Sequence, residues 1–277
     1  MNGLWHIPHG ARLAIQELSH ITALQFEMET SGAKSNCQLN SSLMYSQAMD
    51  LKILAIDIGG TNVKIRIDAD PEKRSFPSGT SLTPQQMVEG VLKLTQGWIF
   101  DAVSIGLPAP ISKNQPTHDP ANLGKGWVDF DYDNGFAKKV KLVNDAAMQA
   151  VGSYEGGRML FLGLGTGLGS CLIADHVIIP MELAHMPYRK GKSFEDAVGV
   201  RALKKHGKKR WEKEVHEVIE IISAGLLPDY VVLGGGNAVR LKDIPKNCRL
   251  GDNANAFTGG FRLWAPEWAK SVAVYHK

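Results

Sequence analysis

Two segments of the chain, at residues 51–67 and 159–173, share one pattern of apolar and polar positions. In the first, an apolar run at 53–58 predicts a buried strand. Apolar and charged residues then alternate over 63–67, which predicts a second strand with one polar face. Gly59 and Gly60 lie between the runs, where missing side chains let backbone N–H groups approach a ligand. This segment therefore predicts a strand, a tight glycine turn and another strand.

The second segment repeats this order, with a Gly165-Thr166-Gly167 turn between two apolar runs. Neither turn matches the common phosphate motifs. No Gly-Lys-Ser/Thr follows, as a P-loop requires, and the outgoing segment is predicted to be a strand where a dinucleotide-binding loop needs a helix. The repeat predicts two similar half-molecules that hold one phosphate chain between them.

Three polar side chains surround the first turn. Asp57 ends the incoming strand, Thr61 lies in the turn and Lys64 follows it. A carboxylate for a metal ion, a hydroxyl and amides for phosphate oxygens, and a nearby cation suit a phosphoryl group. An isolated Asp-x-Gly-Gly-Thr segment is equally compatible with an ordinary hairpin, and the second copy favours the phosphate interpretation.

Composition restricts the class of protein. A chain of 277 residues with 44% apolar and 21% charged residues is typical of a soluble globular protein with one large or two modest domains. The net charge of +3 does not favour a nucleic-acid partner. The three cysteines, Cys37, Cys171 and Cys248, are far apart, which fits a reducing cytoplasm and no zinc or disulfide framework. No apolar run approaches the roughly 18 residues of a membrane span.

Further elements follow from periodicity. We expect a helix from Pro84 with Met87, Val91, Leu94 and Trp98 on one face, and a strand at 102–107. A strand at 139–144 leads into a helix, and an apolar stripe at 211–222 predicts a core-facing helix. A buried strand at 228–233 ends at a run of glycines, and a last helix is expected at 253–264. The basic run at 201–213 is expected to be the solvated face of a helix.

Residues 1–49 carry no assigned role. They predict a flexible appendage, and Met49, just before the first strand, is a candidate for the natural start. A secretory signal is not expected there.

Two polar groups have alternative interpretations. Asn144-Asp145 fits a helix N-cap, but at the carboxyl edge of an α/β sheet the same residues face a ligand. Glu182 and His185 share a face if their turn is helical. A metal pair would lack a third ligand, so hydrogen bonding to ligand hydroxyls is favoured.

These motifs together resemble the ROK family of sugar kinases (repressor, open reading frame, kinase), within the actin-like ATPase superfamily. The resemblance covers residues 52–264 and is closest to the glucokinase and polyphosphate glucokinase branch. It rests on an ordered series of short motifs: Asp57-x-Gly59-Gly60-Thr61, Gly106-x-Pro108, Asn122-Leu123, Asn144-Asp145, Leu164-Gly165-Thr166-Gly167-x-Gly169, Glu182-x-x-His185 and Gly234-Gly235-Gly236.

The resemblance implies an α/β fold with two ribonuclease-H-like domains flanking an active-site cleft. We place these domains at 50–146 and 147–252, with the 253–264 helix packing back on the first. By similarity, Asp145 is the general base for the 6-hydroxyl of glucose. The residues expected to hold the other sugar hydroxyls are Asn122, Asn144, Glu182, His185 and Glu195. Those expected to hold the phosphate chain or a nucleotide are Asp57, Gly59, Gly60, Thr61, Asn62, Lys64, Gly165, Thr166, Gly167, Gly235 and Gly236.

The implied cofactor is Mg²⁺ at Asp57, directly or through water, with ATP or inorganic polyphosphate as phosphoryl donor. Many members carry a cysteine-rich zinc loop after the Glu-x-x-His pair, but residues 186–200 contain no cysteine, so no zinc is expected. The loop 188–192 is basic instead. It is either a solvated loop or, with Lys204 and Lys205, part of a site for a polyanionic donor.

The resemblance also implies a cytoplasmic homodimer without nucleic-acid or membrane partners. Three alternatives remain open: a kinase for another hexose (mannose, fructose or an N-acetylated amino sugar), a sugar-responsive transcriptional repressor, and a catalytically inactive sugar-binding module.

Overall fold

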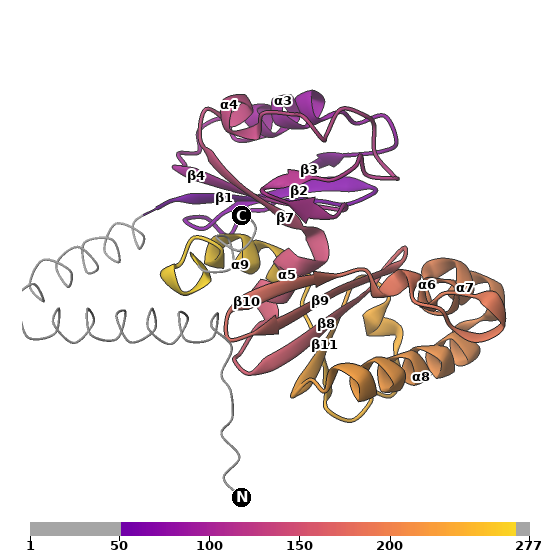
Figure 1. Cartoon of the computed structure of the whole chain (residues 1–277). Helices are drawn as coiled ribbons and strands as arrows, with labels where there is room; N and C mark the ends of the chain where they lie inside the picture. The colour runs from indigo at the N-terminus through magenta and orange to yellow at the C-terminus, as the bar shows by residue number, and fades with distance from the viewer. Residues whose placement is uncertain (1–50, 270–277) are drawn as a thin grey trace, which may run out of the picture. The chain divides into compact units, whose positions relative to one another are not determined.

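The two glycine-containing segments each begin a five-stranded sheet, and the two sheets have the same strand order (Figure 1). The computed structural model describes residues 51–269, so the appendage expected at 1–49, Met49 and Cys37 lie outside the described residues. The order is β3-β2-β1-β4-β7 in the first sheet and β10-β9-β8-β11-β12 in the second. In both, the first three strands of the chain pair antiparallel and the last two add in parallel. The expected duplicated α/β fold is confirmed.

The strands of the first sheet are β1 (Ile53–Ile58), β2 (Asn62–Ile67), β3 (Arg74–Pro77), β4 (Ala102–Leu107) and β7 (Lys139–Asn144). Those of the second are β8 (Arg158–Leu164), β9 (Leu168–Ala174), β10 (Val177–Met181), β11 (Tyr230–Gly234) and β12 (Cys248–Leu250). A small two-stranded sheet pairs β5 (Ile111–Ser112) with β6 (Gln115–Pro116).

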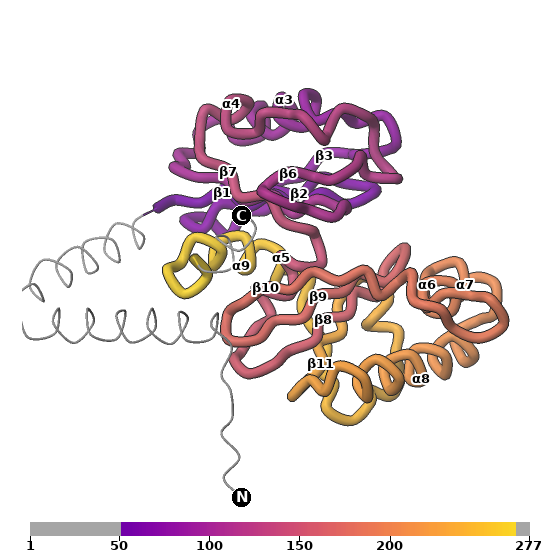
Figure 2. Tube along the Cα trace, viewed as in Figure 1, coloured from indigo at the N-terminus to yellow at the C-terminus, as the bar shows by residue number. Residues whose placement is uncertain are grey.

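Helices connect these strands, as the tube in Figure 2 traces. The α-helices are α3 (Pro84–Leu94), α4 (Tyr132–Phe136), α5 (Asp145–Ser153), α6 (Phe194–Val198), α7 (Val200–His206), α8 (Lys208–Leu226) and α9 (Asn255–Arg262). Short 3₁₀ turns are η1 (Leu183–His185), η2 (Arg189–Gly191), η3 (Ala238–Arg240) and η4 (Pro266–Trp268).

Helix α3 begins as predicted and ends earlier than predicted. Thr83 and Gln86 form a capping box at its start, and Pro84 occupies the first turn. The helix stops at Leu94, so the expectation that Trp98 shares its apolar face is wrong. Gly97, with φ +86°, redirects the chain, and the guanidinium of Arg74 lies 4.1 Å from the centre of the Trp98 ring instead.

The stripe at 211–222 is confirmed as core. Trp211, Val215, Val218, Ile219 and Ile222 of α8 are buried against the second sheet. The basic run at 201–213 is divided between α7 and α8, because Gly207, with φ +77°, separates them. The lysines and arginines of this run are exposed, as expected, but they lie on two helices and not on one.

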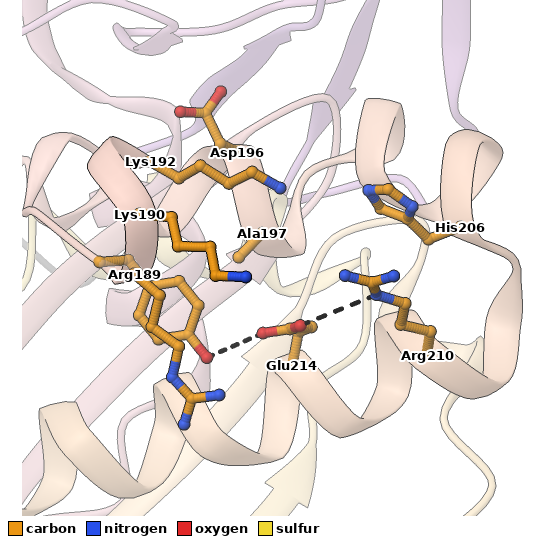
Figure 3. A pocket seen from close by; sticks show the side chains of 9 residues that line it. Arg189, Lys190, Lys192, Asp196, Ala197, His206, Arg210 and Glu214 are labelled. Atoms are coloured by element: carbon orange, nitrogen blue, oxygen red, sulfur yellow. Dashed lines mark hydrogen bonds and ion pairs between the residues drawn. The ribbon is translucent and has the colours of Figure 1, made fainter.

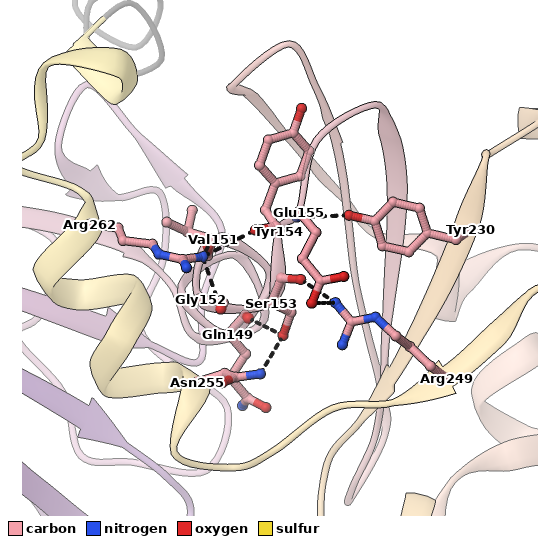
Figure 4. Close-up of polar contacts among 10 residues, drawn as sticks. All are labelled: Gln149, Val151, Gly152, Ser153, Tyr154, Glu155, Tyr230, Arg249, Asn255 and Arg262. Atoms are coloured by element: carbon pink, nitrogen blue, oxygen red, sulfur yellow. Dashed lines mark hydrogen bonds and ion pairs between the residues drawn. The ribbon is translucent and has the colours of Figure 1, made fainter.

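Helices α5 and α9 cross in close contact, and α5 also packs against strands of both sheets. A Cβ added to Gly152 would lie 1.9 Å from the Asn255 carbonyl oxygen, and one added to Gly259 would lie 1.8 Å from that of Met148. Only glycine permits this approach. Figure 4 shows Arg262 of α9 directed at the end of α5, where its Nη1 donates hydrogen bonds of 3.1 Å to the carbonyls of Val151, Gly152 and Tyr154.

Helix α9 also contacts the first sheet. Ser104 of β4 donates a 2.6 Å hydrogen bond to the carbonyl of Gly260, and the indole N–H of Trp264 donates to Ser104 Oγ at 2.9 Å. The expected last helix at 253–264 is present in shorter form, at Asn255–Arg262. The domain boundaries at 146 and 252 stay predictions. No helix among residues 51–269 is long and apolar enough to cross a membrane.

Candidate active site

The first glycine turn connects β1 to β2 and is fixed by its own backbone. Gly59 N–H donates to the carbonyl of Asn62 at 3.0 Å, and Ser78 Oγ donates to the Gly59 carbonyl at 2.7 Å. Asp57, only 8% exposed, ends the strand, and its Oδ2 lies 3.3 Å from Lys64 Nζ. Thr61 and Gly60 remain exposed, so the turn presents backbone and a hydroxyl to solvent beside an anchored carboxylate.

Asn122 lies against this turn although it is sixty residues later in the sequence. A Cβ added to Gly60 would come within 2.6 Å of Asn122 Nδ2, so the amide occupies the space that the glycine leaves. Asp119 orders the loop that carries Asn122, because its Oδ1 accepts hydrogen bonds from the N–H groups of Gly126 and Trp127. The structure thus brings one predicted sugar-binding residue to one predicted phosphate-binding turn.

Asn144 and Asp145 lie where β7 ends and α5 begins. Asn144 is the N-cap: its Oδ1 accepts from the N–H of Ala146 at 2.9 Å, and its Nδ2 donates to the Ala109 carbonyl. The helix N-cap interpretation is confirmed for Asn144, and the expectation that Asp145 faces a ligand stays a prediction. Asn144 serves as the cap, and Asp145 occupies the first turn with Oδ1 accepting from Ala146 N–H at 2.8 Å.

Asp145 is in an unusual electrostatic environment. Burial, with the negative charges of Asp57 and Glu182 nearby, raises the pKa of its carboxyl to about 6, and the Ala146 N–H opposes that rise. The register of the first sheet explains why Asp145 lies near Asp57. Asp57, Gly106 and Val143 are partners across β1, β4 and β7, which places Asp145 two residues beyond the row that contains Asp57. A carboxylate with a pKa near 6 suits proton abstraction near neutral pH.

The second glycine turn connects β8 to β9 and contacts α6 and α7. A Cβ added to Gly167 would lie 2.5 Å from Glu195 Oε2, which places that carboxylate on the turn. Val200 N–H donates to the Thr166 carbonyl at 3.1 Å. Gly169 approaches Ala146 of α5, since a Cβ added there would lie 2.9 Å from the Ala146 Cβ. Asp145 is therefore next to a residue that approaches strand β9 two residues after the second turn.

The segment that follows β11 packs against the second glycine turn. Gly235 has φ +79°, and a Cβ there would lie 2.6 Å from the Leu164 carbonyl oxygen. Asn237 donates its backbone N–H to that same oxygen and its Nδ2 to the Gly165 carbonyl at 3.0 Å. A Cβ added to Gly236 would meet open space. Gly236 thus leaves its backbone accessible, whereas Gly235 serves packing.

Glu182 and His185 do share one face. The 3₁₀ turn η1 places Glu182 Oε2 at 3.9 Å from His185 Nε2, with both side chains more than half exposed. Ser170 holds this segment, because its Oγ donates to the Met181 carbonyl and accepts from Leu183 N–H. The pair is free to meet a polar ligand, and Glu182 is close enough to Asp145 to affect its pKa.

These contacts join the predicted residues into two neighbouring groups. Asp57, Gly60 and Asn122 gather at the first turn, and Gly167 and Glu195 gather at the second. Asp145 interacts electrostatically with Asp57 of the first group and with Glu182. Two positioning side chains were missed from sequence: Ser78, which carries no motif, and the side chain of Asn237, whose only sign was its place after three glycines.

Among residues 51–269, no group of three or more His, Cys, Asp or Glu side chains is arranged to hold a metal ion. The expectation that zinc is absent stays a prediction. Cys171 is a free, buried thiol, and Cys248 is free and partly buried.

Known proteins share this architecture. An inorganic polyphosphate/ATP-glucomannokinase from Arthrobacter aligns with a TM-score of 0.67 at 23% identity, over 78% of this chain and 99% of that one. A ROK family glucokinase from Streptomyces griseus, solved with glucose and AMPPNP, aligns with a TM-score of 0.62 at 14% identity, over 76% and 98%. This chain therefore shares the fold of these two kinases.

The sequence is similar to those of polyphosphate glucokinases. The protein of that name from Mycobacterium leprae is 29% identical over 204 residues, which cover 65% of this chain and 62% of that protein. The one from Mycobacterium tuberculosis strain CDC 1551 / Oshkosh is 26% identical over 204 residues, with coverage of 65% and 76%. No family model matches the sequence. The expected resemblance to ROK sugar kinases, near the polyphosphate glucokinase branch, is confirmed.

Proposed function

We propose that this protein is a sugar kinase that transfers a phosphoryl group from ATP or polyphosphate to the 6-hydroxyl of glucose. The observation that carries the proposal is Asp145. Its carboxylate lies at the start of α5, next to Ala146, which approaches the start of β9 just after the second glycine turn, and within electrostatic reach of Asp57 beside the first. Its raised pKa suits a general base. The similarity to polyphosphate glucokinases supports the choice of sugar and donor.

In the proposed reaction, Asp145 accepts the proton of the sugar hydroxyl while that oxygen attacks the terminal phosphorus of the donor. The bond from phosphorus to its leaving oxygen breaks, and ADP or a shortened polyphosphate leaves. An alcohol is a weak nucleophile at neutral pH, so a positioned carboxylate contributes ~10² to 10⁴-fold. Asn144 keeps Asp145 in place by capping the helix that carries it.

The remaining hydroxyls of the sugar are assigned to side chains at the margins of both turns. Asn122 and Glu195 lie against Gly60 and Gly167, where each can bind sugar while contacting a phosphate-binding turn. Glu182 and His185 are exposed and paired, so they can accept from and donate to neighbouring hydroxyls. Asn144 has one amide hydrogen left, because its oxygen and its other amide hydrogen are used in the protein.

Phosphate oxygens would be held by backbone and hydroxyl donors of the two turns, including Thr61 and Thr166, with Lys64 as the nearby cation. The donor set fits Mg²⁺: Asp57 supplies a fixed carboxylate, and Mg²⁺ is commonly held by one or two carboxylates together with substrate phosphates. When bound, Mg²⁺ would neutralise charge on the transferring phosphoryl group. Asp57 and Lys64 meanwhile hold each other at the edge of the turn.

The direct test is an initial-rate assay with glucose and Mg²⁺, run in parallel with ATP and with polyphosphate. We expect glucose 6-phosphate from at least one donor and none from Asp145→Asn, which should still bind glucose. Turnover of Asp145→Asn at the wild-type rate would remove Asp145 from the role of base. If glucose gives no product, the same assay with mannose, fructose and N-acetylated amino sugars distinguishes another hexose kinase from an inactive binding module.

Several finer features remain part of the proposal. The reaction would take place in the cytoplasm, and the protein would act as a homodimer without nucleic-acid or membrane partners. The repressor alternative needs a DNA-reading domain. Phosphoryl transfer without DNA binding would decide against it.

A further inference from the structure

A basic pocket of about 150 Å³ lies between the loop that follows Glu182-His185 and helix α8 (Figure 3). Four permanent cations line it: Arg189, Lys190 and Lys192 from the loop, and Arg210 from α8. Only two carboxylates, those of Asp196 and Glu214, line it with them. The pocket therefore carries an excess of positive charge.

Two of these cations form no ion pair among residues 51–269. Hydrogen bonds from Ser193 and, less strongly, the charge of Lys192 lower the pKa of the Asp196 carboxyl, so Lys192 is partly compensated. Arg189 pairs with Glu217, and Arg210 Nε lies 4.0 Å from Glu214 Oε1. No ion pair joins Lys190 or Lys192 to a carboxylate in the part of the chain that the structure describes. Figure 3 shows their ammonium ends directed into the space that His206 and Arg210 face from the other side.

The lowered pKa of His206 also indicates that the pocket is positively charged. Desolvation and the positive charges of Arg210, Lys192 and Lys205 lower its pKa, and Glu214 opposes that effect. An anion in the pocket would be attracted by the charges that disfavour the imidazolium. The pocket thus has the chemistry of an anion site.

The loop is also held in shape before any ligand binds. Pro187 and Ser193 form a β-bridge, and Tyr188 N–H donates to the Lys192 carbonyl at 2.6 Å. The Tyr188 hydroxyl donates to Glu214 of α8 at 2.8 Å. Because these bonds fix the backbone on both sides of Lys190 and Lys192, less entropy is lost when the lysines meet an anion.

Helix α6 connects this pocket to the second glycine turn. Glu195 lies against Gly167, and the next two residues, Asp196 and Ala197, line the pocket. A donor held at the turn and long enough to pass α6 would meet Lys190 and Lys192. ATP ends in a nucleoside, whereas polyphosphate continues as a row of negative charges.

We propose that the basic pocket binds phosphoryl groups of a polyphosphate chain that lie beyond the group being transferred. The inference rests on the proposed function and adds a donor-specific subsite to it. Lys190 and Lys192 make the principal contacts, and Arg189 and Arg210 add to the potential. Lys204 and Lys205, which the sequence associated with this loop, do not line the pocket.

The test compares two double variants with equal loss of charge. Lys190→Gln with Lys192→Gln removes the pocket cations that have no ion-pair partner. Lys93→Gln with Lys138→Gln removes two exposed cations that do not line the pocket, one at the end of α3 and one before β7, as the matched control. We expect the pocket variant to raise KM for polyphosphate by about tenfold or more and to change KM for ATP by less than about twofold. The control should change either constant by less than about twofold.

Direct binding separates this inference from the proposed activity. Isothermal titration with polyphosphate, without glucose, should show weaker binding by the pocket variant only, and added salt should reduce the difference. Similar losses in both double variants would mean nonspecific attraction and overturn the site. Orthophosphate that displaces polyphosphate at equal concentration would overturn the assignment to a chain.

Activity assays on the wild type complete the separation. A wild type that uses polyphosphate, with a pocket variant that uses it equally well, would end the inference and leave the kinase proposal standing. If polyphosphate binding depends on Lys190 and Lys192 but the protein shows no turnover, the inferred site would stand and the kinase proposal would fall.

Discussion

Replacing Asp145 with asparagine should remove activity and stabilise the fold at neutral pH. The environment that raises the pKa of the carboxyl from 3.8 to about 6 disfavours its ionised form in the native state. Asparagine keeps the shape and an oxygen that can accept from Ala146 N–H, but it carries no charge. Under the proposed role of Asp145 as general base, catalysis and stability therefore make opposite demands at this position.

The magnitude follows from linkage. A change in pKa from 3.8 to about 6 corresponds to about 3 kcal/mol of stability that the wild type lacks once Asp145 is ionised in both states. The group is partly exposed, so we expect a gain of about 1–3 kcal/mol in the variant. Because the pKa of Asp145 is higher in the folded state than in the unfolded state, the wild type is most stable below the unfolded pKa. It loses this part of its stability as pH rises through about 6.

Urea unfolding at several pH values measures this effect. Between about pH 4.5 and about pH 7.5, the advantage of Asp145→Asn over the wild type should grow by about 1–2 kcal/mol. Asp68→Asn, which removes an exposed carboxylate from the turn after β2, controls for the loss of one negative charge. An advantage that stays constant with pH, or a variant less stable than the wild type at neutral pH, would refute the electrostatic argument.

Three further predictions follow from the same contacts. The wild-type kcat/KM should fall as pH drops below about 6, because protonated Asp145 cannot accept the hydroxyl proton, and a flat pH profile would contradict its role as base. Gly152→Ala should destabilise the protein by about 3 kcal/mol or more in urea unfolding, since its Cβ would lie 1.9 Å from a backbone oxygen. Gly225→Ala, in an exposed turn of α8 with open space around it, should instead be neutral or stabilising by up to about 1 kcal/mol. Gly167→Ala should fold normally but raise KM for sugar and donor, because its Cβ displaces the flexible Glu195 carboxylate, and unchanged kinetics would separate Glu195 from the site.

The sequence predicted strands and core helices well because their burial repeats with a short period. The run at Ile53–Ile58 is buried at every position, and the stripe of α8 falls on one face. Boundaries were less predictable where a single glycine redirects the chain. Gly97 ends the region of α3 before Trp98, and Gly207 divides the basic run, and both effects depend on a positive φ that the sequence does not specify.

The motifs of the site were visible in the sequence, but their pairing was not. Asn122 meets Gly60, and Glu195 meets Gly167, across loops whose paths depend on tertiary packing. The interpretation of Asn144-Asp145 also needed coordinates, since either residue can cap a helix. The structure assigns the cap to Asn144 through its Oδ1.

Because Asn144 caps helix α5, the first turn of the helix can tolerate the destabilising negative charge of Asp145. Asn144 satisfies the N–H of Ala146 and is tied to Ala109, so the cap does not depend on the state of Asp145. Asp145 also accepts from Ala146 N–H, and that bond limits the rise in its pKa. Because the helix is capped by a neighbour, protonating the carboxyl during a reaction cycle would leave the start of α5 intact. A base that also served as the only cap would loosen its own helix each time it accepted a proton.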